Sequence, residues 1–166
     1  GGVTEEDSLH HITGDLVTVV VDDKENVRGF SSTIFGSPKE VLGSGSQEKG
    51  CYLQGATVSK EVWGSGVYKQ MNELRILEGI KSKLPLVFTR TQNPRVEKGI
   101  VAVLEKFIKE KKIKDFQLTR TFVGGCYGTM LTKDEPVLDK SETGIAFGKL
   151  NFRAGDAYVL TFKITY

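Results

Sequence analysis

Histidine, cysteine and long apolar runs are scarce in this sequence, and each scarcity excludes a class of protein. Among its 166 residues the two histidines, His10 and His11, are adjacent and cannot by themselves form a zinc site. The two cysteines, Cys51 and Cys126, are too few for a disulfide scaffold, so we expect two reduced, buried thiols in a cytoplasmic protein. No apolar run approaches the roughly 20 residues of a membrane span. We therefore expect neither a metal nor a membrane partner.

Net charge of either sign is also small. The chain carries a formal charge of +2, which is too little to predict binding to nucleic acid or to an anionic membrane. Its first seven residues, GGVTEED, are polar and acidic, which is unlike a secretory signal peptide. A chain of 166 residues suffices for one domain with a proper core. We expect a polar arm over residues 1–15 and a single domain over residues 16–166.

Runs of β-branched and aromatic residues, bounded by turn residues, predict six strands. They cover residues 16–21, 27–35, 51–58, 86–91, 116–123 and 157–166, and the fifth could resume over 126–131. The first run is so uniformly apolar that we expect a buried strand, and a polar turn at 22–26 joins it to the second as a hairpin. Residues 42–47 are typical of a flexible loop, and residues 132–156 of a long loop or an irregular hairpin arm.

Apolar residues at helical spacing predict a helix after the third strand. It begins near Val67 and ends before Pro85. Met71 and Leu74 belong to its apolar face, and Asn72 belongs to the polar face. We expect this helix to pack on the sheet through the apolar face.

A second helix is predicted over residues 96–108, where Asn93 is a natural N-cap ahead of Pro94 at the first helical position. The order is then hairpin, strand, helix, strand, helix, strand, strand. A strand–helix–strand unit requires a parallel crossover, whereas hairpins require antiparallel pairing. We therefore predict a mixed α/β (α+β) sheet with two helices packed on it. The alternating strand over 157–166 is a candidate edge for a homodimer.

Two glycines stand between the third strand and the first long helix. The sequence after Val58 reads Ser-Lys-Glu-Val-Trp-Gly-Ser-Gly, and the helical pattern starts directly after it. The first N–H groups of a helix have no internal partner, and the helix dipole adds partial positive charge there. Such a turn suits a phosphate group, although a lone Gly-x-Gly is also a plain tight turn.

The element order and this turn resemble the GNAT family of acyl-CoA-dependent N-acetyltransferases. In that family a strand that ends in valine leads to a phosphate-binding signature of the form Gln/Arg-x-x-Gly-x-Gly/Ala. Val58 matches the valine, and residues 63–68 occupy the signature. Gly66 fits the pattern, whereas Trp63 stands where Gln or Arg is usual and Tyr68 where Gly or Ala is usual. Asn93 resembles the asparagine that commonly opens the family's next helix.

The resemblance implies a mostly antiparallel sheet with helices on its faces and a splayed pair of parallel strands, those that contain Val58 and Thr89. It also implies an acyl-CoA cosubstrate, acetyl-CoA or a related thioester, whose pantetheine arm lies between these strands. The pyrophosphate would bind to N–H groups of the glycine turn. The residues expected to bind the cosubstrate are Thr57, Val58, Trp63, Gly64, Ser65, Gly66, Val67, Tyr68 and Asn93.

The catalytic residues are not identified by the sequence. The family often places a tyrosine about seven residues after the asparagine, as the acid that protonates the leaving thiolate, and here that position is Ile100. Tyr52, Cys126 and Tyr127 are candidates by chemistry alone. Two hypotheses follow: an N-acetyltransferase that acts on a small-molecule or peptide amine, or a catalytically degenerate GNAT-like domain that binds acyl-CoA or a protein partner.

Overall fold

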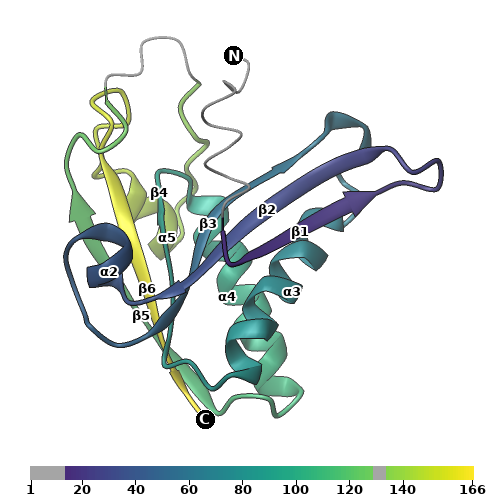
Figure 1. Cartoon of the computed structure of the whole chain (residues 1–166). Helices are drawn as coiled ribbons and strands as arrows, with labels where there is room; N and C mark the ends of the chain where they lie inside the picture. The colour runs from purple at the N-terminus through teal and green to yellow at the C-terminus, as the bar shows by residue number, and fades with distance from the viewer. Residues whose placement is uncertain (1–13, 129–133) are drawn as a thin grey trace. The chain divides into compact units, whose positions relative to one another are not determined.

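A computed structural model describes residues 14–128 and 134–166 and confirms the mixed α/β class (Figure 1). The sheet has six strands in the order β1-β2-β3-β4-β6-β5 and is mostly antiparallel, with β3 and β4 as its one parallel pair among the described residues. The strands are β1 (Leu16–Val21), β2 (Val27–Gly36), β3 (Gly50–Val58), β4 (Leu86–Thr91), β5 (Asp115–Val123) and β6 (Ala157–Thr165). The helices are α2 (Pro38–Leu42), the short 3-10 helix η1 (Lys60–Val62), α3 (Val67–Lys81), α4 (Pro94–Lys109) and α5 (Glu142–Phe147).

The chain divides into two compact units. The first ends at Val87, and the second runs from Phe88 to Tyr166. The expected division into an arm over residues 1–15 and a single domain over 16–166 stays a prediction, because most of the arm lies outside the described residues.

In the first unit, α3 packs against β1, β2 and β3. Met71, Ile76 and Ile80 are its largest buried apolar residues. Gly79 lets the helix approach β3 closely, because a Cβ at this position would lie 2.9 Å from the Cβ of Cys51. This contact between helix and strand forms the core of the unit.

The prediction of a buried strand over residues 16–21 is wrong in one respect. The strand forms, but Val17, Val19 and Val21 are 37%, 50% and 52% exposed. Successive side chains of a strand point to opposite faces. The helix α3 contacts β1 on one side. The three valines therefore remain exposed, while the residues between them are half-buried.

The apolar face of α3 is also rotated relative to its prediction. Leu74 is 53% exposed, whereas Asn72 and Arg75 are buried. The Arg75 guanidinium donates hydrogen bonds to Thr33 Oγ1 at 2.9 Å, to the Ser32 carbonyl at 2.6 Å and to Asn72 Oδ1 at 3.2 Å. Burial lowers the pKa of Arg75 to about 10. These polar partners explain why the helix turns a charged residue toward the sheet.

In the second unit, β5 and β6 form a continuous antiparallel ladder from Asp115 opposite Thr165 to Val123 opposite Ala157. The strand β6 lies between β4 and β5 in the sheet order, so the suggestion that it offers an edge to a homodimer is wrong. Its alternation arises because one face is buried in the core, not because the strand lies at an edge.

The polar segment 132–156 contains a helix that the sequence did not predict. Ser141 caps α5 by accepting a hydrogen bond from the Gly144 N–H at 3.1 Å. The ring of Phe147 packs edge-on against Tyr158 of β6, with centroids 5.2 Å apart. Residues 126–128 form a turn rather than a resumed strand, and 129–133 lie outside the described residues.

A buried carboxylate joins three elements of the second unit. Glu97 of α4 is 1% exposed and accepts two hydrogen bonds from Arg120 of β5, at 2.8 and 2.6 Å. The hydroxyl of Thr143 in α5 donates a third, at 2.7 Å. This network holds α5 and β5 against the first turns of α4.

Candidate cofactor-binding site

The predicted strand–turn–helix is present in the first unit. β3 ends at Val58, η1 follows, and Gly64 and Gly66 bracket Ser65 ahead of α3. Gly64 has φ 79° and Gly66 has φ 84°, a left-handed conformation that L-residues with side chains rarely adopt. No atom lies within 4 Å of a Cβ built at either position. The glycines are therefore required by the backbone conformation and leave open space in front of the helix.

The N-terminus of α3 has neither a capping side chain at its N-cap nor an acidic residue in its first turn. Its N-cap is Gly66, which offers no side-chain acceptor. The Ser65 hydroxyl donates to the Val62 carbonyl at 2.5 Å and accepts a long hydrogen bond from the Val67 N–H at 3.4 Å. The 15-residue helix thus directs its dipole at any incoming anion, without a side-chain cap or an acidic residue in between.

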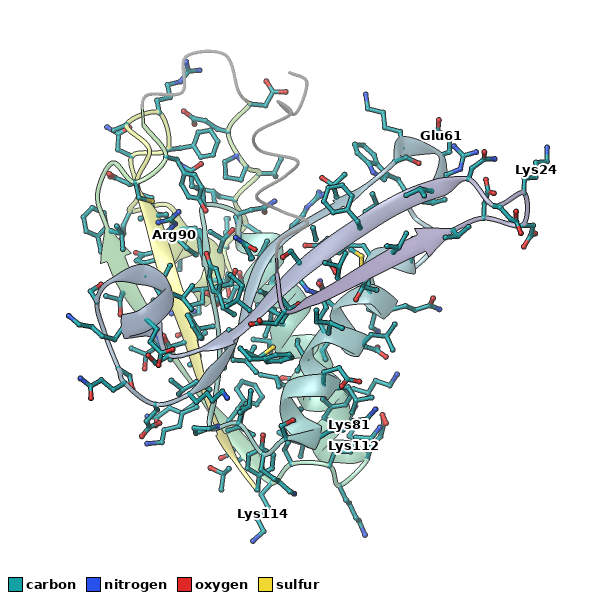
Figure 2. All side chains as sticks on the ribbon, viewed as in Figure 1. Lys24, Glu61, Lys81, Arg90, Lys112 and Lys114 are labelled. Carbon is teal, nitrogen blue, oxygen red and sulfur yellow. The ribbon has the colours of Figure 1, made fainter. Side chains whose placement is uncertain are left out.

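The acidic residue nearest this turn points elsewhere. The side chain of Glu61 is 65% exposed, extends from η1 into solvent (Figure 2), and lies 3.9 Å from the Arg28 guanidinium. Its charge is therefore partly balanced by Arg28. Tyr68, in the first turn of α3, is 39% exposed.

The N–H and C=O groups of Val58 point away from β2. The Ser59 N–H donates to the Arg28 carbonyl at 2.7 Å, which makes the next pair, Gly29 opposite Val58, a non-hydrogen-bonded pair. By the same alternation, Thr57 directs its own groups to β2, opposite Phe30. Among the predicted residues of β3, Val58 is the one whose carbonyl can bond a ligand along the strand.

Trp63 folds back onto that carbonyl. Its indole Nε1–H donates to the Val58 oxygen at 3.0 Å, although the side chain is 66% exposed. The Lys60 ammonium lies 5.9 Å from the ring centroid. Trp63, which stands where the family signature has Gln or Arg, is therefore hydrogen-bonded to Val58 at the end of β3.

Asn93 caps α4 as the sequence predicted. Its Oδ1 accepts from the Arg95 N–H at 2.9 Å, and the Thr91 hydroxyl accepts from the Asn93 N–H at 3.0 Å. Pro94 occupies the first helical position. This arrangement fixes the path of the chain from β4 into α4.

A cavity of about 210 Å³ opens beside this turn, within the second unit. Its lining residues come from the end of β4, the turn after β5 and the loops before β6: Thr91, Gln92, Asn93, Tyr127, Asp134, Pro136 and Phe152. The amide of Gln92 donates to the carbonyls of Phe152 at 3.1 Å and Asp156 at 3.0 Å. Gln92 therefore positions one wall of the cavity.

Of the three candidate acids, Tyr127 alone lines this cavity. Its hydroxyl donates to the Arg90 carbonyl at 2.9 Å, and the Arg90 guanidinium lies 5.2 Å from its ring centroid. Partial burial raises the pKa of the Tyr127 hydroxyl, so the group keeps its proton at neutral pH. The half-buried Cys126 also has a raised pKa through burial, and Tyr52 belongs to the core of the first unit. Ile100, where the family often has tyrosine, is also buried.

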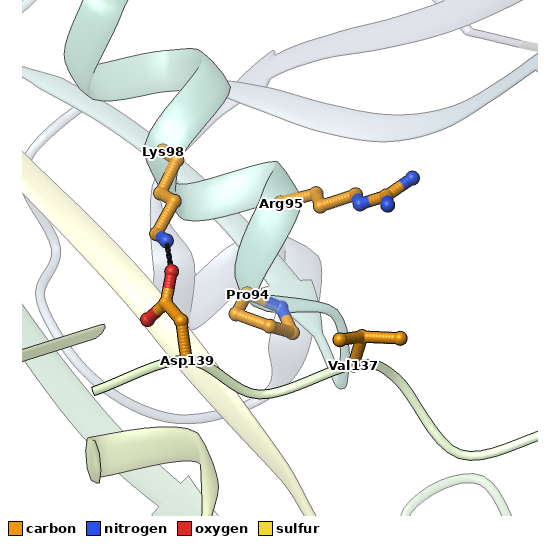
Figure 3. Close-up of a pocket in the computed structure, with 5 residues that line it drawn as sticks. All are labelled: Pro94, Arg95, Lys98, Val137 and Asp139. Carbon is orange, nitrogen blue, oxygen red and sulfur yellow. Dashed lines mark hydrogen bonds and ion pairs between the residues drawn. The ribbon is translucent and has the colours of Figure 1, made fainter. Parts of the chain in front are cut away.

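A second hollow of about 160 Å³ lies along the start of α4 (Figure 3). Pro94, Arg95, Lys98, Val137 and Asp139 line it. Lys98 and Asp139 form an ion pair across it, which lowers the pKa of the Asp139 carboxyl. Arg95 points away from that pair (Figure 3). The ion pair ties the loop before α5 to the side of α4.

Residues 14–128 and 134–166 contain no cluster of three or more potential metal ligands. Within the same ranges, no helix is long and apolar enough to cross a membrane.

Comparisons with known proteins give a match in structure alone. No protein-family profile and no curated protein matches the sequence. Naa20 from Chaetomium thermophilum, solved with a bisubstrate analogue, has a TM-score of 0.52 at 15% identity, and the match covers 89% of this chain and 64% of that one. The Escherichia coli ribosomal-protein-S18-alanine N-acetyltransferase has a TM-score of 0.54 at 14% identity, over 98% of this chain and 79% of that one.

The NatC complex, solved with Gag peptide and CoA, gives a TM-score of 0.50 at 14% identity, over 90% of this chain and 71% of that one. The chain thus spans just under two thirds of the Naa20 chain. Identities this low establish the fold and nothing finer. The strand order with its parallel pair and these three likenesses lead to the same conclusion: the chain has the fold of the GNAT acetyltransferases.

Proposed function

We propose that the protein is an N-acyltransferase that transfers an acyl group from acetyl-CoA, or a related thioester, to an amine of a small molecule or peptide. The observation that carries the proposal is the uncapped N-terminus of α3 behind two left-handed glycines. The resemblance to the GNAT family implies that the pyrophosphate of the cosubstrate binds at this helix N-terminus. Naa20 bound to a bisubstrate analogue and NatC bound to CoA support a cosubstrate of this kind. The two free thiols support a cytoplasmic setting.

In this proposal the backbone N–H groups from Gly64 to Tyr68 bind the pyrophosphate. Val58 accepts a hydrogen bond from the pantetheine arm, with Thr57 beside it in the strand and Trp63 at the rim. Asn93 contributes through the turn that it caps at the start of α4.

The chemistry requires positioning and one proton donor. The amine attacks the thioester carbonyl, a tetrahedral oxyanion forms, and the C–S bond breaks as the amide forms. We assign the proton that the leaving thiolate takes up to the Tyr127 hydroxyl, which lines the cavity at the end of β4. Its raised pKa keeps it protonated for this role. The proton released by the amine passes to solvent.

A binding domain without catalysis is the alternative. It is favoured by the buried Ile100 at the position where the family often has its acid, and by Trp63 within the phosphate signature. The two functions differ in one measurement. An enzyme releases free CoA thiol when acetyl-CoA is supplied with an amine panel, whereas a binding domain leaves the thioester intact.

The proposed pyrophosphate site at the glycine turn is tested by Gly66→Glu, with CoA affinity measured by calorimetry. A carboxylate at the helix N-terminus would repel the pyrophosphate, so we expect a loss of at least about 100-fold, or roughly 2.7 kcal/mol. Gly43→Glu is the matched control, because Gly43 also has a left-handed φ, of 80°, and open space at its Cβ. Both variants carry the same backbone strain and the same added charge. Equal CoA affinity in the two variants would contradict the placement of the pyrophosphate.

A further inference from the structure

The hydrogen bond between Trp63 and Val58 occupies the acceptor that a pantetheine arm would need. Val58 is the last residue of β3, and its carbonyl points away from β2. The indole reaches it from five residues further along the chain, at 3.0 Å. The indole therefore already uses this acceptor.

The Trp63 side chain is largely exposed apart from this hydrogen bond. The side chain is 66% exposed, and the Lys60 ammonium lies 5.9 Å from its ring centroid. Trp63 itself ends η1, directly before the left-handed Gly64. An exposed ring on a short turn can leave its acceptor without opening the core of the unit.

We propose that the Trp63 indole is a displaceable cap on the Val58 carbonyl, and that a pantetheine amide must displace it to bind. This inference rests on the proposed function, because it assumes that the arm runs along β3. It makes Trp63 a residue that selects for ligands with an amide-bearing arm. A nucleotide that lacks the arm would bind at the glycine turn and leave the cap closed.

The expected effect is modest and specific. A net hydrogen bond of roughly 1 kcal/mol corresponds to about fivefold in affinity. Trp63→Phe keeps an aromatic ring at the rim but removes the indole donor. We therefore expect this variant to bind CoA about fivefold more tightly than the wild type. Its affinity for adenosine 3′,5′-diphosphate, which lacks pantetheine, should be unchanged.

The sequence supplies its own reporter, because Trp63 is the single tryptophan. The indole N–H gives one signal in a heteronuclear NMR spectrum. CoA and free pantetheine should shift this signal toward the position of a solvent-exposed indole, whereas adenosine 3′,5′-diphosphate should not. Because a carbonyl oxygen can accept two hydrogen bonds, this signal also separates displacement from sharing. Thermal melting of Trp63→Phe confirms that the fold is kept.

The possible results are distinguishable. An indole signal that stays in place at saturating CoA overturns the cap and leaves the proposed function standing, as does equal or weaker CoA binding by Trp63→Phe. Absence of CoA binding in both the wild type and Trp63→Phe overturns the proposed function, and the cap with it. Tighter binding of CoA alone, together with the indole shift, supports both.

Discussion

Glu97 and Arg120 form a two-pronged ion pair, in which the Arg120 Nε–H and one terminal N–H reach separate oxygens of a carboxylate that is 1% exposed. Removal of the cation leaves a buried carboxylate with the Thr143 hydroxyl as its remaining side-chain donor among those described. Leaving one member of such a pair uncompensated costs about 3–5 kcal/mol. We predict a loss of this size in the free energy of unfolding for Arg120→Ala, measured by chemical denaturation.

Lys81→Ala is the control for that loss. Lys81 pairs with Glu78 at 3.3 Å, but both side chains are largely exposed. An exposed pair contributes about 0–1 kcal/mol. Similar losses for the two alanine variants would contradict the structural role of the buried pair.

The two thiols should differ in reactivity. Burial raises the pKa of Cys51 to about 12, whereas Cys126 is only half-buried and is therefore more accessible to a reagent. A thiol reagent at pH 8 should modify Cys126 first and Cys51 only as the first unit opens. Cys126→Ser should remove the fast phase of modification and leave the slow phase, which we assign to Cys51. Loss of the slow phase in this variant would contradict that assignment.

The same shift affects stability at high pH. The pKa of Cys51 is higher in the folded chain than the ordinary 9.0 of an exposed thiol. The contribution of the Cys51 thiol to the free energy of unfolding is therefore present in full below pH 9. It decreases as the pH rises toward 12, because the unfolded chain loses this proton first. Cys51→Ala should show a weaker decrease in stability over this range, measured by denaturation at several pH values.

Tyr127→Phe tests the proposed acid. Loss of general acid catalysis should lower kcat about 100-fold or more, while CoA affinity stays within about twofold of the wild type. Because the pKa of Tyr127 is raised above its ordinary value, the wild-type rate should show no alkaline decline below a pH of about 10 from this group. Steady-state kinetics across pH measure both effects.

Tyr158→Phe provides the comparison. Tyr158 also donates to a backbone carbonyl, that of Ala146, at 2.8 Å, so this variant loses a similar hydrogen bond in the same unit. It should lower stability by about 1 kcal/mol and leave kcat unchanged. If both variants lose the same fraction of kcat, Tyr127 is not the acid.

Asp22 should make the tip of the first hairpin sensitive to acid. Its carboxylate accepts from the N–H groups of Asn26 at 2.9 Å and Lys24 at 2.8 Å, and pairs with Arg28. These hydrogen bonds, chiefly that from Asn26, lower the pKa of Asp22 to about 2. The contribution of the ionised Asp22 carboxylate to the stability of the hairpin tip is present in full above the ordinary pKa of 3.8. It is lost as the pH falls through about 2.

An NMR titration of the Lys24 and Asn26 amides should report a midpoint near pH 2 in the wild type. Asp22→Asn should abolish that transition, whereas the neighbouring Asp23→Asn should leave it in place. A midpoint near 3.8 would show that these hydrogen bonds do not persist in solution.

The strands and long helices were predictable because each carries a repeated local pattern. The run over β6 alternates throughout, and Asn93-Pro94 marks the start of α4 by cap chemistry alone. The helices α2 and α5 were missed because five and six residues are too few to show helical periodicity. Burial was less predictable than secondary structure, as the exposed valines of β1 illustrate.

In the candidate site, too, features set by local sequence were predictable and long-range contacts were not. The glycine turn was predictable because a left-handed backbone restricts residue choice locally. The contact of Tyr127 with Arg90 was not, since 37 residues separate them and no periodicity relates them. The same holds for Glu97, whose carboxylate looks like any exposed charge of a helix until Arg120 is placed beside it.

The long ladder between β5 and β6 also has a consequence for the order of folding. The β1–β2 hairpin closes over a short turn, whereas β6 meets β5 only after residues 124–156 have been synthesised. Closure of a long loop costs more entropy and delays pairing. During translation, therefore, the hairpin of the first unit can form early, whereas β5 can begin to pair only when Ala157 has left the ribosome and can complete its ladder only when Thr165 has followed.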